Sequence, residues 1–254
     1  MKLMKILRFS FFVILFLGVA AYVIYAMVNM SKTDPEELCT DIVLNIKDSS
    51  YASFVDSVKV KDMLKSAKLY PKGLQMKEVD TRGIENELRK NEFIETVECY
   101  KSTKGKLCVN VVQRTPVIYI LPDNAAGYFI DRTGKIIPNT NYVANIIVAT
   151  GNLTPDYAVN KILPLGLLMQ DEPFWNNQIE QIHVSVTQGN KRRVELVPRV
   201  GKQIICLGDI DGFEKKLRRL KIFYEKAMGK VGWNKYDKIN LEYNNQIICT
   251  KQKK

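Results

Sequence analysis

An uncharged apolar run near the N-terminus limits the folds open to this chain more than any other feature. Residues 9–30 are apolar almost throughout and contain no Lys, Arg, Asp or Glu. About 20 such residues form a helix that can cross the roughly 30 Å core of a bilayer. Lys2, Lys5 and Arg8 precede the run, and positive charge favours the cytoplasmic side. The pattern predicts a single-pass anchor over 9–30, with a tail over 1–8 inside and the bulk of the chain periplasmic or otherwise extracytoplasmic.

A cleaved signal peptide is the alternative explanation of this run. Small residues at Gly18, Val19 and Ala20 follow a hydrophobic stretch of suitable length for cleavage. The apolar run nevertheless continues to Val28, and cleavage would leave those residues as an apolar N-terminus with nothing to pack against. The sequence therefore favours a retained anchor.

The body beyond the anchor is basic. The chain has a formal net charge of +11, and its first eight residues carry three of these charges, which leaves about eight for the body. A basic body can contact anionic lipid, anionic wall polymers or acidic protein surfaces, or it can be a solvated surface without a specific partner. No basic stripe is interleaved with aromatic residues in the way that single-stranded nucleic acid requires. Nucleic acid is therefore not an expected partner.

The five cysteines do not form a pattern of known chemistry. Their number is odd, and they are scattered along the chain, which argues against a disulfide framework. No C-x-x-C spacing supports a zinc or redox site. Cys99 and Cys108 flank a predicted turn, but strand alternation places their side chains on opposite faces, so we expect no bridge between them.

Residues 40–114 are expected to form a compact domain of two helices on a three-stranded sheet. A polar linker over 31–39, which contains a proline, precedes it. Leu107, Val109 and Val111 alternate and predict the buried face of one strand. The expected elements are a strand over 41–47, helices over 54–69 and from 80 or 81 onward, and strands over 94–101 and 106–114.

Residues 115–250 are expected to form a mixed, mostly antiparallel β-domain that ends in a helix and a strand, followed by a tail over 251–254. Asp209 or Asp211 is positioned to cap the long helix, and Gly229 to end it. The expected elements are strands over 117–121, 127–131, 135–137, 145–149, 178–186, 191–198, 202–207 and 238–250, a short broken helix over 162–169 and a long helix over 211–228.

A search for catalytic groups finds little. The single histidine, His183, lies in a predicted strand and faces away from Ile182 and Val184, which leaves no basis for a Ser-His-Asp arrangement or a histidine metal site. The nucleophile-elbow and phosphate-loop motifs are absent. Helix capping and a loop position account for the acidic pairs at 209/211 and 171/172. We expect no enzyme activity, no cofactor, no metal and no small-molecule substrate.

Binding is therefore the better prediction, and the last strand is the candidate surface. A strand at the end of a chain is often a sheet edge, whose unpaired N–H and C=O groups can accept a partner strand. The alternative is that this strand only completes the core.

Three motifs, in order, resemble the bacterial cell-division protein family FtsQ/DivIB. Residues 106–116 contain Leu107, Val109, Val111, Arg114 and Pro116, which fit the pattern L-x-V-x-V-x-x-R-x-P. Residues 128–134 fit the hairpin pattern y-x-i-D-x-x-G, and residues 239–248 fit the family's final strand. The first domain resembles the POTRA module of this family, and the resemblance extends over nearly the whole chain.

The resemblance implies a non-enzymatic scaffold of the division septum in the cytoplasmic (inner) membrane. It further implies that the last strand binds a partner of the FtsB/DivIC type, which itself coils with an FtsL-type protein, and that upstream division proteins act through the POTRA-like domain. Carried over by position, the partner-binding residues are Tyr243, Asn245, Ile247 and Cys249. Glu242 departs from the pattern because many relatives have arginine there. The alternative function is a POTRA-type chaperone or scaffold of an envelope transport or assembly system.

Overall fold

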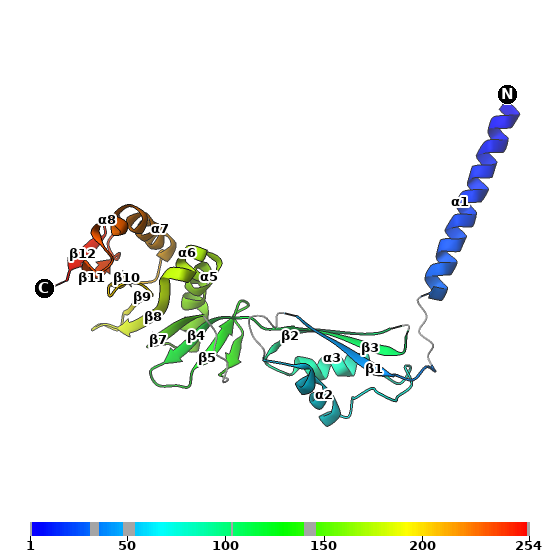
Figure 1. Ribbon diagram of the computed structural model, residues 1–254, viewed down its shortest axis with the longest axis horizontal. Helices are drawn as coiled ribbons and strands as arrows, with labels where there is room; N and C mark the ends of the chain where they lie inside the picture. Colours follow the sequence, from blue (N-terminus) through cyan, green and yellow to red (C-terminus); the bar gives the residue numbers. More distant parts are fainter. Residues whose placement is uncertain (1, 31–35, 48–53, 103, 140–145, 253–254) are drawn as a thin grey trace. The chain divides into compact units, whose positions relative to one another are not determined.

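The chain forms two compact units, which are described separately. The structure is a computed structural model, and it describes residues 2–30, 36–47, 54–102, 104–139 and 146–252 (Figure 1). The first unit comprises residues 1–47 and 55–112, and the second comprises residues 48–54 and 113–254. Both mix helices with sheet, and the second is rich in strands, so the α+β class expected from the sequence is correct.

The N-terminal apolar run lies in a helix. Helix α1 extends over Lys2–Met30. Within the described ranges, however, no helix combines the length and the apolar character that a membrane span requires. The anchor over 9–30 stays a prediction from the sequence. Most of the expected linker, residues 31–35, lies outside the described residues.

The first unit is a three-stranded sheet with two helices on one face (Figure 1). The sheet has the order β1-β3-β2, with β1 parallel to the central strand β3. Chain order is β-α-α-β-β, as the sequence predicts. The elements are β1 (Asp41–Lys47), α2 (Ser57–Ser66), α3 (Thr81–Arg89), β2 (Ile94–Lys101) and β3 (Lys106–Gln113).

Side-chain caps and alternating apolar residues explain these elements. The Asp80 carboxylate accepts a hydrogen bond from the Gly83 amide at 2.9 Å and so begins α3, as expected. Leu107, Val109 and Val111 on β3 are fully buried, which confirms the predicted alternation. The buried residues of the two helices are Val60, Leu64, Ile84 and Leu88. All five cysteines of the chain are free thiols.

The second unit is built on a nine-stranded mixed sheet with the order β12-β11-β10-β9-β8-β7-β4-β5-β6. Neighbouring strands are parallel in three pairs, β4–β7, β7–β8 and β10–β11, and otherwise antiparallel. The strands are β4 (Pro116–Pro122), β5 (Tyr128–Asp131), β6 (Ile136–Pro138), β7 (Ile147–Gly151), β8 (Ile179–Val186), β9 (Arg192–Pro198), β10 (Ile204–Gly208), β11 (Tyr236–Asn240) and β12 (Ile248–Lys251).

One hydrophobic core joins the helices of this unit to one face of the sheet. Trp175, Leu217 and Leu220 pack in it with strand residues such as Val194 and Ile239. The residues that alternate with these core residues along β8–β11 therefore lie on the opposite face of the sheet. The helical segments are α4 (Pro155–Tyr157), the π-helix η1 (Ala158–Ile162), α5 (Leu163–Asp171), α6 (Pro173–Gln178), α7 (Phe213–Phe223), the π-helix η2 (Tyr224–Met228) and α8 (Gly229–Val231).

Three expectations about the helices of the second unit are wrong. The helix expected over 162–169 begins earlier, at Pro155, where the Thr154 side chain caps it, and helical structure continues to Asp171. Asp209 and Asp211 do not cap α7, because its N-cap is Gly212 and no side chain caps it. Gly229 does not end the C-terminal helix, since helical structure extends to Val231.

A buried ion pair joins two of the motifs found in the sequence. Arg114 follows β3, and its Nη1 lies 2.6 Å from the Oδ2 of Asp131, at the end of β5. The other oxygen of Asp131 accepts hydrogen bonds from the amides of Thr133 and Lys135 and from the Thr133 hydroxyl. Burial alone would raise the pKa of Asp131, but the hydrogen bonds from Thr133, Arg114 and Lys135 outweigh it and hold that pKa below its usual value.

Candidate partner-binding edge

A C-terminal hairpin forms one edge of the nine-stranded sheet. Strand β11 pairs in parallel with β10 on one side and antiparallel with β12 on the other. In the described part of the chain, β12 ends the sheet. A terminal strand exposes backbone donors and acceptors along its outer side, so β12, like β6 at the other end of the sheet, offers an edge that another chain can extend.

Strand alternation identifies which backbone groups of β12 point outward. The Leu241 amide donates to the Cys206 carbonyl of β10 at 2.8 Å. Consequently, the preceding amide, that of Asn240, points to β12, where Ile248 is its register partner. Because alternate residues of a strand direct their N–H and C=O groups to opposite sides, the backbone of Cys249 faces outward. Its side chain is partly buried against the core.

Arg219 of α7 holds the loop between β11 and β12. Its Nη1 donates to the carbonyls of Tyr243 at 2.8 Å and Gln246 at 3.2 Å, and its Nη2 donates to the carbonyl of Leu241 at 3.0 Å. The rigid guanidinium fork suits several acceptors at once. One side chain therefore fixes both ends of the loop to the helix and sets the position of β12.

We expect Arg219→Gln to loosen the hairpin without unfolding the unit. The substitution leaves carbonyls without their charged donor, and water replaces it because the site is partly exposed. A cost of about 1–2 kcal/mol, typical of such hydrogen bonds, corresponds to amide exchange about 5–30 times faster in residues 248–251. Hydrogen-exchange mass spectrometry measures this rate. Glu214→Gln on the same helix, at an exposed position, is the matched control; equal protection in both variants would contradict the role of Arg219.

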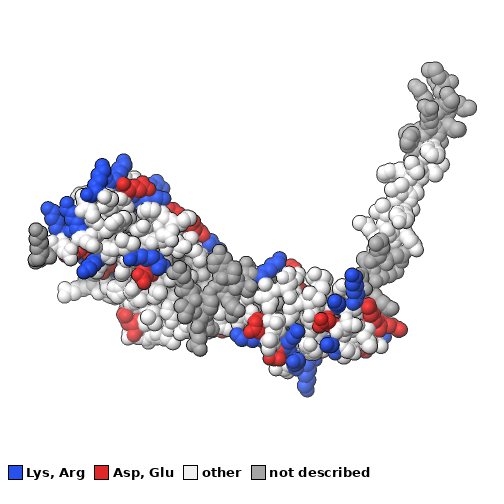
Figure 2. All heavy atoms as spheres, in the orientation of Figure 1, with Lys and Arg blue, Asp and Glu red and all other residues white. Residues whose placement is uncertain are grey.

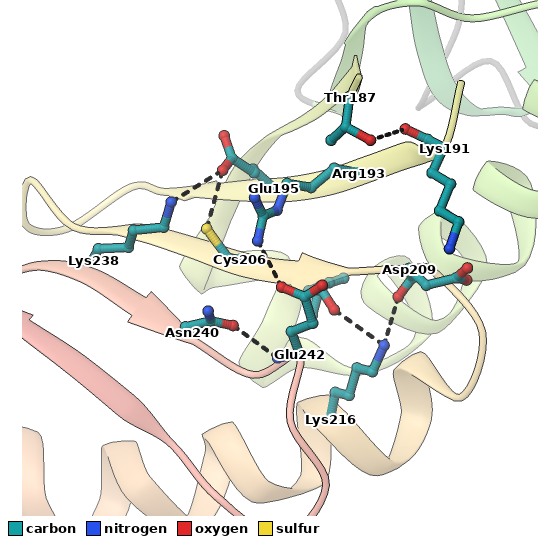
Figure 3. A network of polar contacts seen from close by, with 11 residues as sticks. Thr187, Lys191, Arg193, Glu195, Cys206, Asp209, Lys216, Lys238, Asn240 and Glu242 are labelled. Carbon is teal, nitrogen blue, oxygen red and sulfur yellow. Dashed lines mark hydrogen bonds and ion pairs between the residues drawn. The ribbon is translucent and has the colours of Figure 1, made fainter. Parts of the chain in front are cut away.

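A salt bridge stabilises the start of the same loop. The Arg193 Nη2 on β9 lies 2.6 Å from the Glu242 Oε2, and the Asn240 side chain accepts a hydrogen bond from the Glu242 amide (Figure 3). Gly208 lies beneath Glu242 with φ +70°, and a Cβ there would come within 2.7 Å of the Glu242 Cγ. Glu242, which departs from the family pattern, thus has its own basic partner in this chain.

A second polar group lies on the same face of the sheet, opposite the core. Glu195 on β9 is contacted by Cys206 of the neighbouring strand β10 and by Lys238 of β11 (Figure 3). The Cys206 thiol donates to the Glu195 Oε1 at 3.0 Å, and the Lys238 Nζ lies 3.7 Å from the same oxygen. Burial, together with the Glu195 carboxylate, raises the pKa of Cys206 to about 11. The thiol is therefore protonated at neutral pH and serves packing rather than nucleophilic chemistry.

Hydrogen bonds join the first turn of α7 to the end of β10. The Lys216 Nζ donates to the carbonyls of Leu207 at 3.0 Å and Asp209 at 2.5 Å (Figure 3). Burial lowers the pKa of Lys216, although nearby Asp209 and Glu242 act in the opposite direction. These bonds hold α7, and with it Arg219, against the strand that neighbours the hairpin.

The structure separates the four residues predicted to bind a partner. The single strand expected over 238–250 is wrong: a turn interrupts it, with Asn245 at φ +61°. Tyr243 and Asn245 are exposed in the turn, Ile247 precedes β12, and only Cys249 lies in the edge strand. Asn and Gly are the residues that best tolerate positive φ, which explains why the chain reverses there.

The acidic pairs and the histidine have structural partners. His183 faces away from the core as expected, and its Nδ1 lies 3.0 Å from the Thr150 hydroxyl. Asp211 forms an ion pair with Lys161 at 2.9 Å, and Asp171 pairs with Arg132. Among the described residues, no group of three or more His, Cys, Asp or Glu side chains is arranged to hold a metal ion.

Comparison with known proteins identifies two regions of the chain. The family model described as FtsQ/DivIB, C-terminal related, matches residues 115–250, which is more than half of the chain. A model of the POTRA-like domain matches residues 37–112. No curated protein matches the chain. Both matches agree with the resemblance found in the sequence motifs, and together they show that the chain belongs to the FtsQ/DivIB family of cell-division proteins.

Proposed function

We propose that this protein is a non-enzymatic division scaffold that binds an FtsB/DivIC-type partner by strand addition at the outer side of β12. The observation that supports it most directly is the edge position of β12, at the end of a hairpin that Arg219 fixes to α7. A partner strand gains main-chain hydrogen bonds at such an edge, while alternate side chains supply specificity.

The partner-binding surface in this proposal comprises β12 and the adjacent turn. The Cys249 backbone meets the partner strand directly. Tyr243 is 52% exposed and Ile248 is 46% exposed, so each offers apolar surface to the same partner. Asn245 and Ile247 lie between them in the chain. An FtsL-type protein joins this complex through the partner, and upstream division proteins act through the POTRA-like unit.

The proposed location is the division septum, with the chain anchored in the cytoplasmic membrane. The apolar run over 9–30 and the preceding basic residues support an anchor with its N-terminus inside. The proposed domain boundaries are those expected from the sequence: tail 1–8, anchor 9–30, linker 31–39, POTRA-like domain 40–114, β-domain 115–250 and tail 251–254.

A fluorescent fusion at the N-terminus tests this function in dividing cells. We expect a band at mid-cell, and filamentous growth when the protein is depleted. A uniform envelope signal with normal division would reject the division role and favour a POTRA-type chaperone or scaffold of an envelope transport or assembly system.

A further inference from the structure

The positive charge of the body is confined to its last quarter. Residues 31–198 contain 21 Lys or Arg and 21 Asp or Glu, so their formal charges cancel. Residues 199–254 contain 14 Lys or Arg but only six Asp or Glu. The whole excess of positive charge in the body therefore lies in the segment that forms β10, α7, α8 and the C-terminal hairpin.

Nine cations of this segment form two groups, and the first group, of four, serves the fold. Lys216 and Arg219 donate to backbone carbonyls, and Lys221 and Lys238 have acidic partners in Glu172 and Glu195. These side chains are used inside the unit and are not free to hold a ligand.

The second group faces solvent, and we call it the outer basic face. It comprises Lys215, Arg218, Lys226, Lys230 and Lys235, all of them exposed. In the part of the chain that the structure describes, none of the five has a carboxylate within 4.0 Å. Figure 2 shows Lys and Arg gathered over the end of the second unit that carries α7, α8 and the hairpin.

Helical spacing aligns these cations. Lys215, Arg218 and Lys226, with the exposed Ile222 between them, recur at intervals of three and four residues on the side of α7 and η2 away from the core. At 1.5 Å per residue, Lys215 and Lys226 lie about 16 Å apart along the axis. Lys230, in α8, follows Lys226 after four residues, and Lys235 comes after the helical structure ends at Val231.

We infer that the outer basic face binds a flexible polymer of phosphate diesters, of the kind found in cell envelopes. A line of unpaired cations on the convex side of a helix matches a chain of regularly spaced anionic groups, and a flexible chain can follow the line beyond the helix end. Binding of this type gains free energy from counterion release and depends steeply on salt.

A flat lipid surface fits the face less well. Helices that lie in a membrane interface bury several apolar residues alongside their cations. On this line only Ile222 is exposed to a substantial extent, at 47%. The other apolar residues of the helix, such as Leu217 and Tyr224, are buried in the core of the unit. The contact we infer is therefore electrostatic and independent of apolar insertion.

Titration of the full-length protein in neutral detergent with fluorescently labelled poly(glycerol phosphate) tests this inference by anisotropy. For five cations and a slope of about −0.7 per charge, raising salt from 50 to 200 mM weakens binding roughly a hundredfold. The triple variant Lys215→Gln, Arg218→Gln, Lys226→Gln removes three charges, and the same change of salt then weakens its binding only about sevenfold.

The matched control removes three exposed cations from the first unit, whose surface is balanced in charge: Lys72→Gln, Lys77→Gln and Lys104→Gln. We expect the control to retain the affinity and the salt slope of the unchanged protein. Tryptophan fluorescence, which reports on Trp175 and Trp233, verifies that the outer-face variant is folded. Equal losses in the two variants would overturn the inference, as would binding to anionic vesicles or to a polyglutamate peptide without binding to the polymer.

Discussion

Replacing Cys249 with proline will abolish partner binding while the protein stays folded. The Cys249 amide points away from β11, so proline removes no hydrogen bond of the hairpin itself. It does remove the donor that a partner strand needs, and its ring obstructs the approach of that strand. A partner carbonyl left unpaired in the interface costs about 1–3 kcal/mol, and with the steric clash we expect affinity to fall at least about a hundredfold. Calorimetric titration with the purified FtsB/DivIC-type partner measures this loss.

Two further variants separate the effect of the outward Cys249 amide from the effects of the thiol and of the hairpin's own hydrogen bonds. Cys249→Ser keeps the outward amide and removes the thiol, and it should retain affinity within about threefold, the range of a modest side-chain contact. Thr250→Pro removes an inward amide that pairs with Lys238, so it should expose the hairpin to rapid hydrogen exchange as well as weaken binding. Normal affinity of Cys249→Pro would reject strand addition at β12 without affecting the family assignment.

Much of the first unit could be predicted because its elements depend on local signals. Asp80 caps a helix within three residues, and Leu107, Val109 and Val111 alternate within one strand. Strand and helix order followed from these patterns. The nine-stranded order of the second sheet could not be obtained in this way, since parallel neighbours such as β4 and β7 are set by tertiary packing.

The C-terminal edge of the sheet was predicted in the right region of the chain, but its geometry differs from the single strand that was expected. Residues 238–250 alternate well enough to suggest one strand, yet Asn244 and Asn245 were a turn signal within it. Arg219 gave no local signal, because the carbonyls it binds lie 22 to 27 positions further along the chain. Only packing of α7 against the hairpin shows its role. In the same way, the pairing of Glu242 with Arg193 crosses 49 positions.

The largest loss of stability is expected when Asp131 is replaced by asparagine. The change leaves the Arg114 guanidinium without its counter-charge. Both side chains are shielded from water, since that of Asp131 is 3% exposed and that of Arg114 is 17% exposed. Breaking one side of a buried pair typically costs about 3–5 kcal/mol. For a unit of this size we expect a fall in melting temperature of roughly 10 °C. Both tryptophans, Trp175 and Trp233, lie in the second unit, so their fluorescence follows its unfolding alone.

At acidic pH, the difference in unfolding free energy between Asp131→Asn and the unchanged protein should disappear. The pKa of Asp131 is lowered in the folded state, so the stability that its charge contributes is present above the unfolded pKa of about 3.9 and is lost as pH falls through the lower, folded value. The gap in unfolding free energy should therefore be full at pH 7 and narrow below about pH 4. Asp171→Asn, which breaks the exposed pair with Arg132, is the control and should leave the melting temperature at pH 7 almost unchanged. A gap for Asp131→Asn that is constant with pH would mean that shape and hydrogen bonding, and not charge, join the Arg-x-Pro and Asp-x-x-Gly motifs.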